Sequence, residues 1–332
     1  MRYSFRKTVS GSAGTGQTQA TGVTTTGSAG TVGPRISSFT NSGPITVTSG
    51  QTISGLWITR TSGSGSCISI ADGATNIIIE DCKIGPNSDS TDTGHGIDVF
   101  DGGVITINNC LFDNISTAFY AVQSNGLMKF HHNYATRIRG PFPRGQIVQF
   151  NQCNTPGSKI MYNISDQTNP GYLDGPEDHI NMYGSTGNSS NPILIKYNKL
   201  RGGGPSQSGG GALCGDEGGG YVTIDSNNLV NPGQYGIAIA GGNNCQLINN
   251  KVYGEQFAWS NIGAYAWNQY PAYPYQNHEI SGNRINWVNS MGTPNNWWDG
   301  GDPAALTVIN NVFGDSTINA SIWDEVFPEE SV

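Results

Sequence analysis

The feature of this sequence that most constrains its fold is a short apolar run that recurs along the chain and is followed by asparagine. Clear instances are ITINNCLF, KIMYNISD, LIKYNKLR and QLINNKVY. Subtraction of residue numbers shows that one aligned position recurs every 22 to 35 residues. A unit of strand and turn repeating at such a period is typical of a solenoid, in which each unit stacks on the one before it. The aligned positions are Asp81, Asn109, Asn133, Asn163, Asn198, Asn228, Asn250, Asn283 and Asn311.

The composition of these units indicates that the solenoid is built from strands. β-Branched residues, as in the Ile-Ile-Ile of residues 77–79, favour strands, whereas the Gly, Asn, Asp and Ser between the runs favour turns. Asparagines at the same turn of each coil can stack and hydrogen-bond to the backbone of the neighbouring coil. We therefore predict an all-β fold, a single-stranded right-handed parallel β-helix (β-solenoid) of about eight to ten coils, with the hand that parallel crossovers favour.

The chain divides into two parts near residue 38. Residues 1–38 are rich in Gly, Ser, Thr and Ala without apolar periodicity, which predicts an extended N-terminal arm. Residues 39–332 carry the repeat and are expected to form the β-helix. The acidic segment after Asn311 is expected to cap the open strand edges of the last coil. Long loops are expected at residues 165–178, 201–220 and 253–278.

Charge and hydropathy argue against two kinds of partner. The net charge is −8 and no basic stripe is present, so we expect no nucleic acid to bind. No stretch of about 18 apolar residues occurs, so we expect no membrane insertion. The first residues, MRYSFRKTVSGSAGTG, lack the apolar segment of a secretory signal. We therefore expect no signal peptide, and we place the protein on a virion surface or outside the cell.

The sequence contains 6 cysteines, and none of them forms a CxxC pair. Zinc and redox motifs are therefore not indicated. The spacing of the cysteines follows the repeat, which leaves two interpretations open. They are either free thiols buried in the stacked turns, as cysteines commonly are, or disulfides between neighbouring coils.

Residues 130–151, FHHNYATRIRGPFPRGQIVQFN, join the end of one strand to the start of the next through a turn rich in proline. Arg139 and Arg144 lie in this turn, on either side of Pro141 and Pro143. A rigid pair of guanidinium groups suits a carboxylate or a phosphate. The alternative is structural, since the same groups can brace the turn by binding backbone carbonyls or a nearby Asp.

The order of NIIIEDCKI, GHGIDV, VITINNCLF and the 130–151 segment resembles the pectate lyase family, whose members are right-handed parallel β-helices. The resemblance covers residues 76–152 and is carried by a strand ending in HHN that is followed by R-x-P-x-x-R-G. It implies a polysaccharide lyase that acts on uronate polymers. The matching residues are His131, His132, Asn133, Arg139, Pro141, Arg144 and Gly145.

In a lyase of this kind, Arg139 would remove the proton α to the uronate carboxylate, and Arg144 would hold that carboxylate. Ca²⁺ would acidify the carbon and would be bound by carboxylates of the preceding coils, for which Glu80 and Asp98 are the candidates. The sequence departs from the family pattern at residues 113–123, DNISTAFYAVQ, which lack the expected lysine.

A second candidate constellation consists of acidic residues in two of the long loops. Paired carboxylates can hydrolyse a glycosidic bond, with one acting as acid and the other as base or nucleophile. The GHG of residues 94–96 also occurs in β-helix polygalacturonases, but here it precedes the acids, so that hydrolase pattern is not matched. Solvated turn residues, with or without bridging Ca²⁺, are the alternative, and we assign Asp216 and Glu217 to substrate binding. The acids are Asp174, Glu177, Asp178, Asp216 and Glu217, with Arg201 nearby.

Aromatic residues gather between residues 253 and 275, and Trp297 and Trp298 follow. Aromatic rings stack on sugars and are frequent at interfaces, although they can equally form a small core beneath a loop. The candidate sugar contacts are His131, Tyr253, Trp259, Tyr265 and Trp267.

Three functions are compatible with these observations. The first is a virion-associated surface protein of a bacteriophage, of the tail-spike or head-decoration type. It would attach to other virion or assembly proteins through residues 1–38 and contact bacterial surface polysaccharide with its coils. By resemblance to β-helix spikes, it would form a homo-oligomer such as a trimer. The second is a calcium-dependent polysaccharide lyase that uses β-elimination, and the third is a purely structural scaffold.

Overall fold

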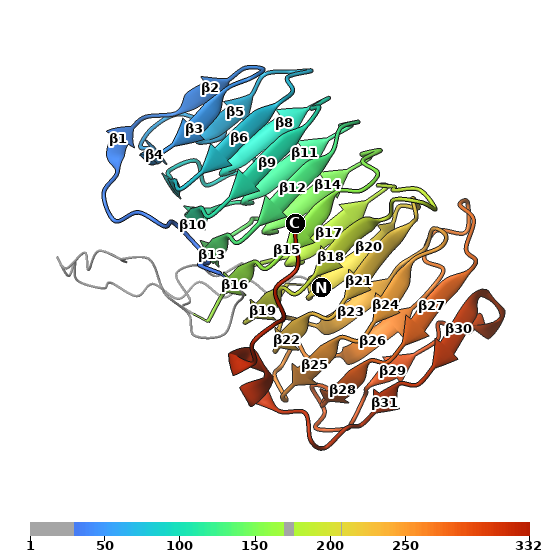
Figure 1. Cartoon of the computed structure of the whole chain (residues 1–332). Coiled ribbons are helices and arrows are strands. Elements are labelled where there is room, and N and C mark those ends of the chain that lie inside the picture. Colours follow the sequence, from blue (N-terminus) through green and yellow to red (C-terminus); the bar gives the residue numbers. More distant parts are fainter. Residues whose placement is uncertain (1–29, 169–175, 207) are drawn as a thin grey trace, which may run out of the picture.

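The computed structural model describes residues 30–168, 176–206 and 208–332 (Figure 1). The chain winds into a right-handed parallel β-helix, which confirms the predicted fold class. Each coil contributes one strand to each of three parallel sheets, which we call sheets A, B and C in the order in which the chain first enters them. The sheets contain 11, 10 and 10 strands.

The strands are short, and each one pairs with its equivalents in the coils before and after it. Sheet A contains β1 (Thr40–Ser42), β4 (Leu56–Arg60), β7 (Lys83–Asn87), β10 (Leu111–Ile115), β13 (Tyr134–Ile138), β16 (Ile164–Asp166), β19 (Lys199–Arg201), β22 (Asn228–Val230), β25 (Lys251–Gly254), β28 (Arg284–Trp287) and β31 (Val312–Phe313). Sheet B contains β2 (Ile45–Val47), β5 (Ile68–Ile70), β8 (Ile97–Phe100), β11 (Phe119–Val122), β14 (Val148–Asn151), β17 (Ile180–Tyr183), β20 (Ala212–Asp216), β23 (Tyr235–Ile239), β26 (Ile262–Ala266) and β29 (Trp297–Trp298). Sheet C contains β3 (Thr52–Ser54), β6 (Ile77–Glu80), β9 (Ile105–Asn108), β12 (Met128–His131), β15 (Lys159–Met161), β18 (Ile193–Lys196), β21 (Val222–Asp225), β24 (Gln246–Ile248), β27 (His278–Ser281) and β30 (Leu306–Ile309). Two 3₁₀ helices, η1 (Pro303–Ala305) and η2 (Ala320–Asp324), lie near the C-terminus.

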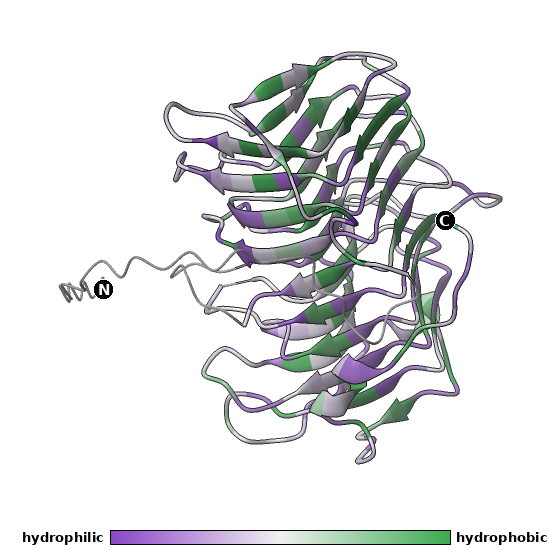
Figure 2. Cartoon of the chain, turned by 60° about the vertical axis from the view of Figure 1, so that its left-hand side comes forward, coloured by the Kyte–Doolittle hydropathy of each residue, from purple (hydrophilic) through white to green (hydrophobic). Residues whose placement is uncertain are grey.

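The core runs along the inside of the solenoid. Side chains of a strand alternate between the two faces of the sheet, so alternate residues of each strand point inward. Register stacks the inward residues in columns, and hydrophobic positions recur along the strands (Figure 2). Each column thus buries apolar surface against the coil above and the coil below. One column in sheet C consists of Ile79, Ile107, Phe130, Ile160, Ile195, Ile224, Leu247 and Ile280.

A ladder of buried asparagines lies at the turn from sheet C to sheet A. Oδ1 of Asn163 accepts hydrogen bonds from the backbone N–H and Nδ2 of Asn133, at 3.0 and 3.1 Å. Nδ2 of Asn163 donates to the carbonyl of Phe130 at 2.8 Å and to Oδ1 of Asn198 at 2.9 Å. Each amide therefore ties one coil to the next, as the sequence predicted. The ladder consists of Asn133, Asn163, Asn198, Asn227, Asn250, Asn283 and Asn311.

Three of the predicted ladder positions are wrong by one residue. Cys110 occupies the ladder position in an earlier coil, since its N–H donates to Oδ1 of Asn133 at 2.9 Å. Asp81 and Asn109 each lie one residue before this position and have positive φ. Asn228 lies one residue after it, and its amide binds the carbonyl of Ile322 instead. In each case the inner position belongs to a neighbouring residue that is completely buried, namely Cys82, Cys110 or Asn227.

The residue before each ladder position takes the left-handed conformation. Examples are His132, Tyr162 and Tyr197, with φ between 55° and 57°. Asn and Gly tolerate this conformation best, so a histidine or a tyrosine there must be stabilised by its surroundings. The ring of His132 stacks on Tyr162 at 4.9 Å, and Tyr162 packs on Tyr197 at 5.3 Å. Aromatic stacking between coils thus reinforces the turn.

All 6 cysteines are buried and free. Of the two interpretations that the sequence left open, buried thiols are confirmed. Cys82 and Cys110 stand in for asparagine in the early coils, where their Sγ atoms lie 3.2 and 3.3 Å from the carbonyls of Glu80 and Asn108.

Both ends of the described chain run along the turns between sheets C and A. The guanidinium of Arg35 binds the carboxylate of Asp81, and the N–H of Gly33 donates to the carbonyl of His132 at 2.8 Å. The predicted arm, residues 1–38, therefore has its last nine residues laid along the coils, whereas residues 1–29 lie outside the described part. The boundary at residue 38 stays a prediction.

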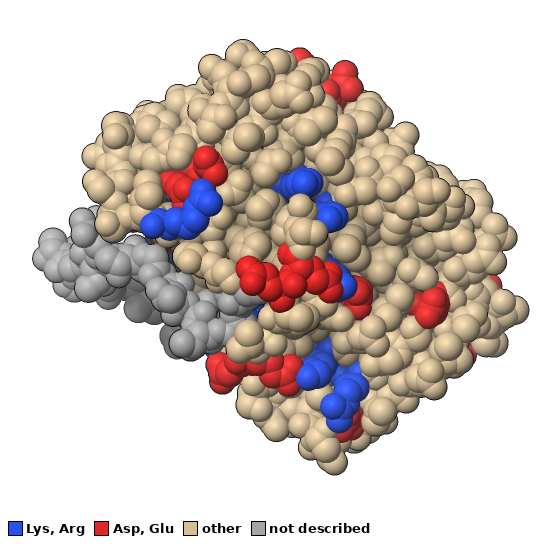
Figure 3. Space-filling model, viewed as in Figure 1, with Lys and Arg blue, Asp and Glu red and all other residues tan. Residues whose placement is uncertain are grey.

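The C-terminal segment does not cap the last coil, so that prediction was wrong. After η2 the chain runs back along the outside of the earlier coils (Figure 1). Phe327 packs on Tyr197 at 5.2 Å, and Glu330 pairs with Lys196 at 3.0 Å. Figure 3 shows this face as largely uncharged, with acidic and basic side chains gathered around the C-terminus. Charge and ring complementarity along the side of the solenoid therefore direct the segment away from its open end.

No helix in the described part of the chain is long and apolar enough to cross a membrane.

The ladder gives the first testable prediction. Asn163→Ala removes the acceptor of the Asn133 backbone N–H and leaves the buried carbonyl of Phe130 without its amide donor. Each buried polar group left unpaired costs about 1–3 kcal/mol, so we expect the free energy of unfolding to fall by about 3 kcal/mol or more. Urea denaturation measures this change.

The matched control is Asn41→Ala, since Asn41 is exposed on β1. We expect the control to change the free energy of unfolding by less than about 0.5 kcal/mol. Equal destabilisation by the two substitutions would show that the ladder contributes nothing specific.

Candidate functional site

The outer face of sheet B carries a row of side chains that register stacks along the solenoid. Its side chains are polar in the early coils and aromatic in the last coils, and two acidic residues lie beside its middle. Neighbouring strands lie about 4.8 Å apart, so each member is one such step from the next. The row consists of Asp98, Tyr120, Gln149, Asn181, Leu213, Ala238, Tyr265 and Trp298.

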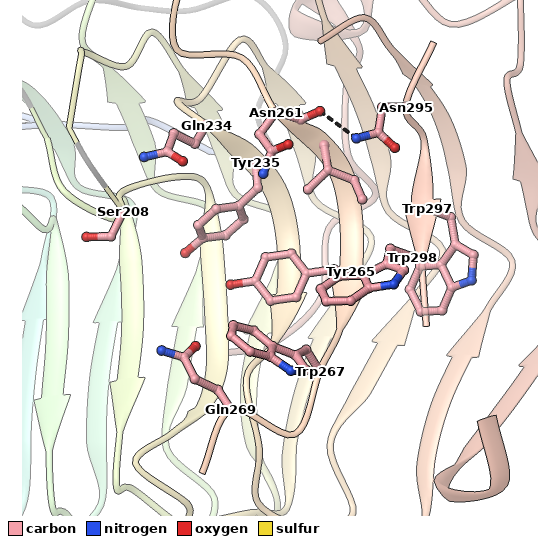
Figure 4. Close-up of a pocket in the computed structure, with 11 residues that line it drawn as sticks. Ser208, Gln234, Tyr235, Asn261, Tyr265, Trp267, Gln269, Asn295, Trp297 and Trp298 are labelled. Carbon is pink, nitrogen blue, oxygen red and sulfur yellow. Dashed lines mark hydrogen bonds between the residues drawn. The ribbon is translucent and has the colours of Figure 1, made fainter. Parts of the chain in front are cut away.

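At the aromatic end of this row, a pocket of about 560 Å³ opens on the outer face (Figure 4). Tyr265 and Trp298 come from the row itself, and the ring of Trp267 lies 5.8 Å from that of Trp298. Amide side chains provide the polar part of the wall. The lining residues are Ser208, Gln234, Tyr235, Asn261, Ile262, Tyr265, Trp267, Gln269, Asn295, Trp297 and Trp298.

In the middle of the face, an amide bridges two carboxylates. Nδ2 of Asn181 donates to Oδ2 of Asp178 at 2.8 Å and to Oδ2 of Asp216 at 2.9 Å. These two oxygens therefore lie within about 6 Å of one another. Tyr235 donates its hydroxyl to the other oxygen of Asp178, and Tyr270 donates to Oδ1 of Asp216. Tyr235 also lines the pocket, so the acids and the aromatic pocket are continuous.

A β-bulge turns Asp216 outward. The register between β17 and β20 shifts so that Tyr183 pairs with Asp216 rather than with Gly215. Gly215 has φ of 72°, and a Cβ atom there would come within 2.0 Å of the carbonyl oxygen of Gly241. Only glycine fits this position, and a bulge is a common way to re-aim a functional side chain.

Burial sets the protonation of Asp178. Loss of solvent raises the pKa of its carboxyl to about 7, and the nearby charges of Glu177 and Asp216 act in the same direction. The hydrogen bonds from Tyr235 and Asn181 oppose this shift. Asp178 is 4% exposed, whereas Asp216 is partly exposed. The site thus pairs a buried carboxyl group, which holds its proton up to near neutral pH, with a second carboxyl group that solvent can reach.

The loop between β26 and β27 closes over these acids. Tyr270 binds Asp216, and Tyr273 donates to Oε1 of Glu217 at 3.3 Å. Gly218 lies beneath the ring of Tyr273, where a Cβ atom would come within 2.8 Å of it. The predicted loop at residues 253–278 therefore reaches the acids of the predicted loop at residues 201–220.

Arg144 lies at the polar end of the same face. Its guanidinium stacks on the ring of Tyr120 at 4.1 Å and donates to the hydroxyl of Tyr120 at 2.7 Å and to Oε1 of Gln149 at 3.1 Å. Asn151 also donates to the Tyr120 hydroxyl, at 3.0 Å. The structure therefore brings Arg144, Asp216, Tyr265 and Trp267 to one surface, although the sequence assigned them to three separate motifs.

Arg139 lies beneath the surface, with 7% of its area exposed. Its guanidinium donates to the backbone carbonyls of Asn87, at 2.9 Å, and of Asp89. These contacts correspond to the bracing role that the sequence left open. They join the turn after β13 to the end of β7 and the residues that follow it, two coils earlier.

The calcium candidates do not come together. Glu80 ends β6 in sheet C and pairs with Arg35 at 2.8 Å, whereas Asp98 lies on β8 in sheet B. Within the described ranges, no three His, Cys, Asp or Glu side chains gather closely enough to hold a metal ion. Glu80 and Asp98 are close in the sequence, which made them the candidates. They lie on different sheets of the solenoid, so their side chains point in different directions.

Several other candidates lie away from this face. His131 ends β12 in sheet C, where its Nδ1 lies 3.0 Å from Nδ1 of His132 and burial lowers its pKa to about 3. Tyr253 lies on β25 in sheet A, and Trp259 stacks on Phe257 at 5.2 Å, outside the pocket. Arg201 pairs with Asp166 at 2.6 Å on sheet A. Asp174 lies outside the described residues.

Sequence reasoning did not assign a role to several residues of the site. Tyr235 and Asn181 gave no signal, because each is an ordinary member of a strand until register sets it beside an acid. Trp298 belongs to a Trp-Trp pair that the sequence did show, in a strand of two residues that is too short to predict. Asp178 was one of five candidate acids, and nothing in the sequence separated it from the others.

Comparison with known proteins gives similarity at the level of solved structures. No family model matches the sequence, and no curated protein matches it. The chain is similar to the A-modules of two mannuronan C-5 epimerases of Azotobacter vinelandii, AlgE6 (13% identity, TM-score 0.36, covering 82% of this chain and 86% of that chain) and AlgE4 (13%, 0.30, 82% and 85%). It is also similar to the catalytic domain of a GH87 α-1,3-glucanase in complex with tetrasaccharides, at 13% identity and a TM-score of 0.38, covering 83% of this chain and 64% of that chain.

The buried carboxyl predicts a pH-dependent stability. The pKa of Asp178 is about 7 in the folded protein and about 4 when unfolded, so the folded state holds the extra proton between these values. This contribution to stability is complete below about pH 4 and is lost as the pH rises through about 7. Because Asp178→Asn removes the titration, its stability relative to the parent should increase by up to about 4 kcal/mol between pH 4 and pH 8.

Denaturation of both proteins across this pH range measures the difference. The control is Asp72→Asn, since Asp72 is exposed in the loop after β5. A constant difference between parent and Asp178→Asn at every pH would mean that Asp178 has an ordinary pKa.

Proposed function

We propose that this protein binds polysaccharide along the outer face of sheet B. The observation that carries this proposal is the pocket of about 560 Å³, in which Tyr265, Trp267 and Trp298 stand among amide side chains. Aromatic faces pack against the C–H faces of sugar rings, and amides can both donate to and accept from sugar hydroxyls. A concave surface with aromatic walls and a few polar groups is the usual form of a ligand site.

The dimensions of the face suit a chain of sugars rather than a single sugar. From Tyr120 to Trp298 the row crosses six strand steps, a length of about 29 Å. Hydrogen-bonding groups, acids and aromatic rings follow one another along this length. A glycan lying along the solenoid axis would meet each group with successive sugars.

The two alternative functions have less support. A lyase needs the Arg139 guanidinium to act as a base on the substrate, but that guanidinium already donates to the backbone carbonyls of Asn87 and Asp89. A purely structural scaffold would not need an open pocket with an exposed tryptophan, and Trp298 is 46% exposed. Binding of an extended glycan would use both the open pocket and its exposed tryptophan.

Substitution of the pocket aromatics tests the proposal. Trp298→Ala and Trp267→Ala each remove one stacking surface, so we expect each to weaken binding of a glycan found on a polysaccharide array by about tenfold or more. The stability of both variants should stay near that of the parent, because both side chains are partly exposed.

The matched control is Trp259→Ala, because Trp259 is a partly buried tryptophan outside the pocket. We expect it to change affinity less than twofold. Unchanged binding by both pocket variants, or loss of binding only in the control, would reject the outer face of sheet B as the site.

Attachment to a phage particle is a further part of the proposal and rests on the composition of residues 1–38. Deletion of residues 1–29 leaves Gly33 and Arg35 in place on the coils. We expect the shortened protein to fold, with unchanged thermal unfolding, and to lose co-sedimentation with particles. Retained attachment would reject the role of the arm, and sedimentation of the free protein would show whether it is the expected trimer.

A further inference from the structure

One atom of the amide that bridges Asp178 and Asp216 has no hydrogen-bond partner in the described part of the chain. Oδ1 of Asn181 is buried and accepts no hydrogen bond from any residue that the structure describes. The side chain is 4% exposed and belongs to the outward row of sheet B, beside the two carboxylates. A buried carbonyl oxygen without a donor is costly, so this position suits a ligand that donates a hydrogen bond, as a sugar hydroxyl does.

The two carboxyl groups differ in the way that acid catalysis requires. Asp178 is almost fully buried and carries its proton up to about pH 7, whereas Asp216 is partly exposed and receives hydrogen bonds from Asn181 and Tyr270. Glu177, Tyr235 and Tyr265 also face Asp178, and Glu177 is itself held by the hydroxyls of Ser206 and Ser208.

We infer that Asp178 and Asp216 form a glycoside hydrolase centre that cleaves the polysaccharide bound on this face. The inference rests on the proposed function, since it needs a glycan bound in this position. It adds an activity to the binding, and it assigns a role to each carboxyl group.

The separation of the two groups sets the mechanism. Their bridged oxygens lie within about 6 Å of one another, which matches the short spacing of retaining glycosidases rather than the wider spacing of inverting ones. Asp178 donates its proton to the glycosidic oxygen while Asp216 attacks the anomeric carbon, so the glycosidic bond breaks and an ester forms. Water then attacks the same carbon, Asp178 takes the proton from that water, and the ester bond breaks to release Asp216.

The charge around this centre selects the substrate. Glu177, Asp178, Asp216 and Glu217 all lie at or next to it, and Arg144 stands at the other end of the polar row, with Tyr120 and Gln149. A sugar carboxylate at the point of cleavage would be repelled by these acids. The sugars on either side of the cleaved bond are therefore uncharged, and their hydroxyls supply the donor that Oδ1 of Asn181 lacks.

The test uses the full chain and a panel of neutral polysaccharides (α- and β-linked glucans, mannan, galactan and xylan), with pectate and alginate as the acidic polymers. Release of reducing ends measures cleavage, and affinity electrophoresis in the same polymers measures binding. We expect the parent to cleave a polymer that it binds, with retention at the anomeric carbon by NMR. Asp178→Asn and Asp216→Asn should each lower kcat by about 10³-fold, near the middle of the range for loss of an acid or a nucleophile, without loss of binding.

Tyr235→Phe supplies a readout that a purely structural role would not change. The Tyr235 hydrogen bond lowers the pKa of Asp178, so its removal should raise that pKa and move the alkaline limb of the pH–rate profile upward. Asp72→Asn, an exposed Asp in the loop after β5, serves as the matched control and should keep the parent rate. A cooperative thermal unfolding transition in every variant establishes that each one folds.

The outcomes separate the two proposals. Binding of a neutral polymer without release of reducing ends overturns the hydrolase centre and leaves the proposed binding function in place. Cleavage that survives both Asp→Asn substitutions also overturns the centre. Absence of binding to every polymer, neutral or acidic, overturns both proposals.

Discussion

The asparagine ladder at the turn between sheets C and A is the interaction on which the rest of the structure depends. Each amide accepts from the backbone of one coil and donates to the next, so neighbouring coils cannot slip by a residue without leaving buried polar groups unpaired. Register is thereby fixed from the coil of Cys110 to the last coil. Cys82 and Cys110 occupy the ladder position in the early coils. There the N-terminal segment binds the outside of the turn, where the amide of Asn109 donates to the carbonyl of Thr31.

Fixed register makes the outer face of sheet B a single surface. Asn181 and Tyr265 are 84 positions apart in the sequence numbering but only three strand steps apart in space, about 14 Å. The bulge at Gly215 adds Asp216 to the same face. The side chains on this face therefore change from polar near Arg144, through the acids, to aromatic at Trp298. This order results from stacking of the coils, each of which contributes one or two groups.

Loops complete the site and explain its electrostatics. The segment that carries Asp178 precedes β17, and the loop with Tyr270 follows β26, so the acids are enclosed from both ends of the strands. This enclosure removes solvent from Asp178 and raises its pKa, while Asp216 keeps access to the face. One surface thus holds a buried and a partly exposed carboxyl group, together with an amide oxygen that accepts no hydrogen bond from the described residues and suits a hydroxyl.

The sequence by itself determined the solenoid, since the period of the apolar runs and their asparagines leave few other ways to bury both. It also marked the acids, the tryptophans and Arg144 as unusual. It did not determine which asparagine of a pair enters the ladder, that Arg139 would be buried, that Glu80 and Asp98 would lie on different sheets, or that the C-terminus would run back along the coils. Only the tertiary structure decided these points, because the direction of a side chain depends on one-residue register and on bulges such as Gly215, which a repeat of variable length does not encode.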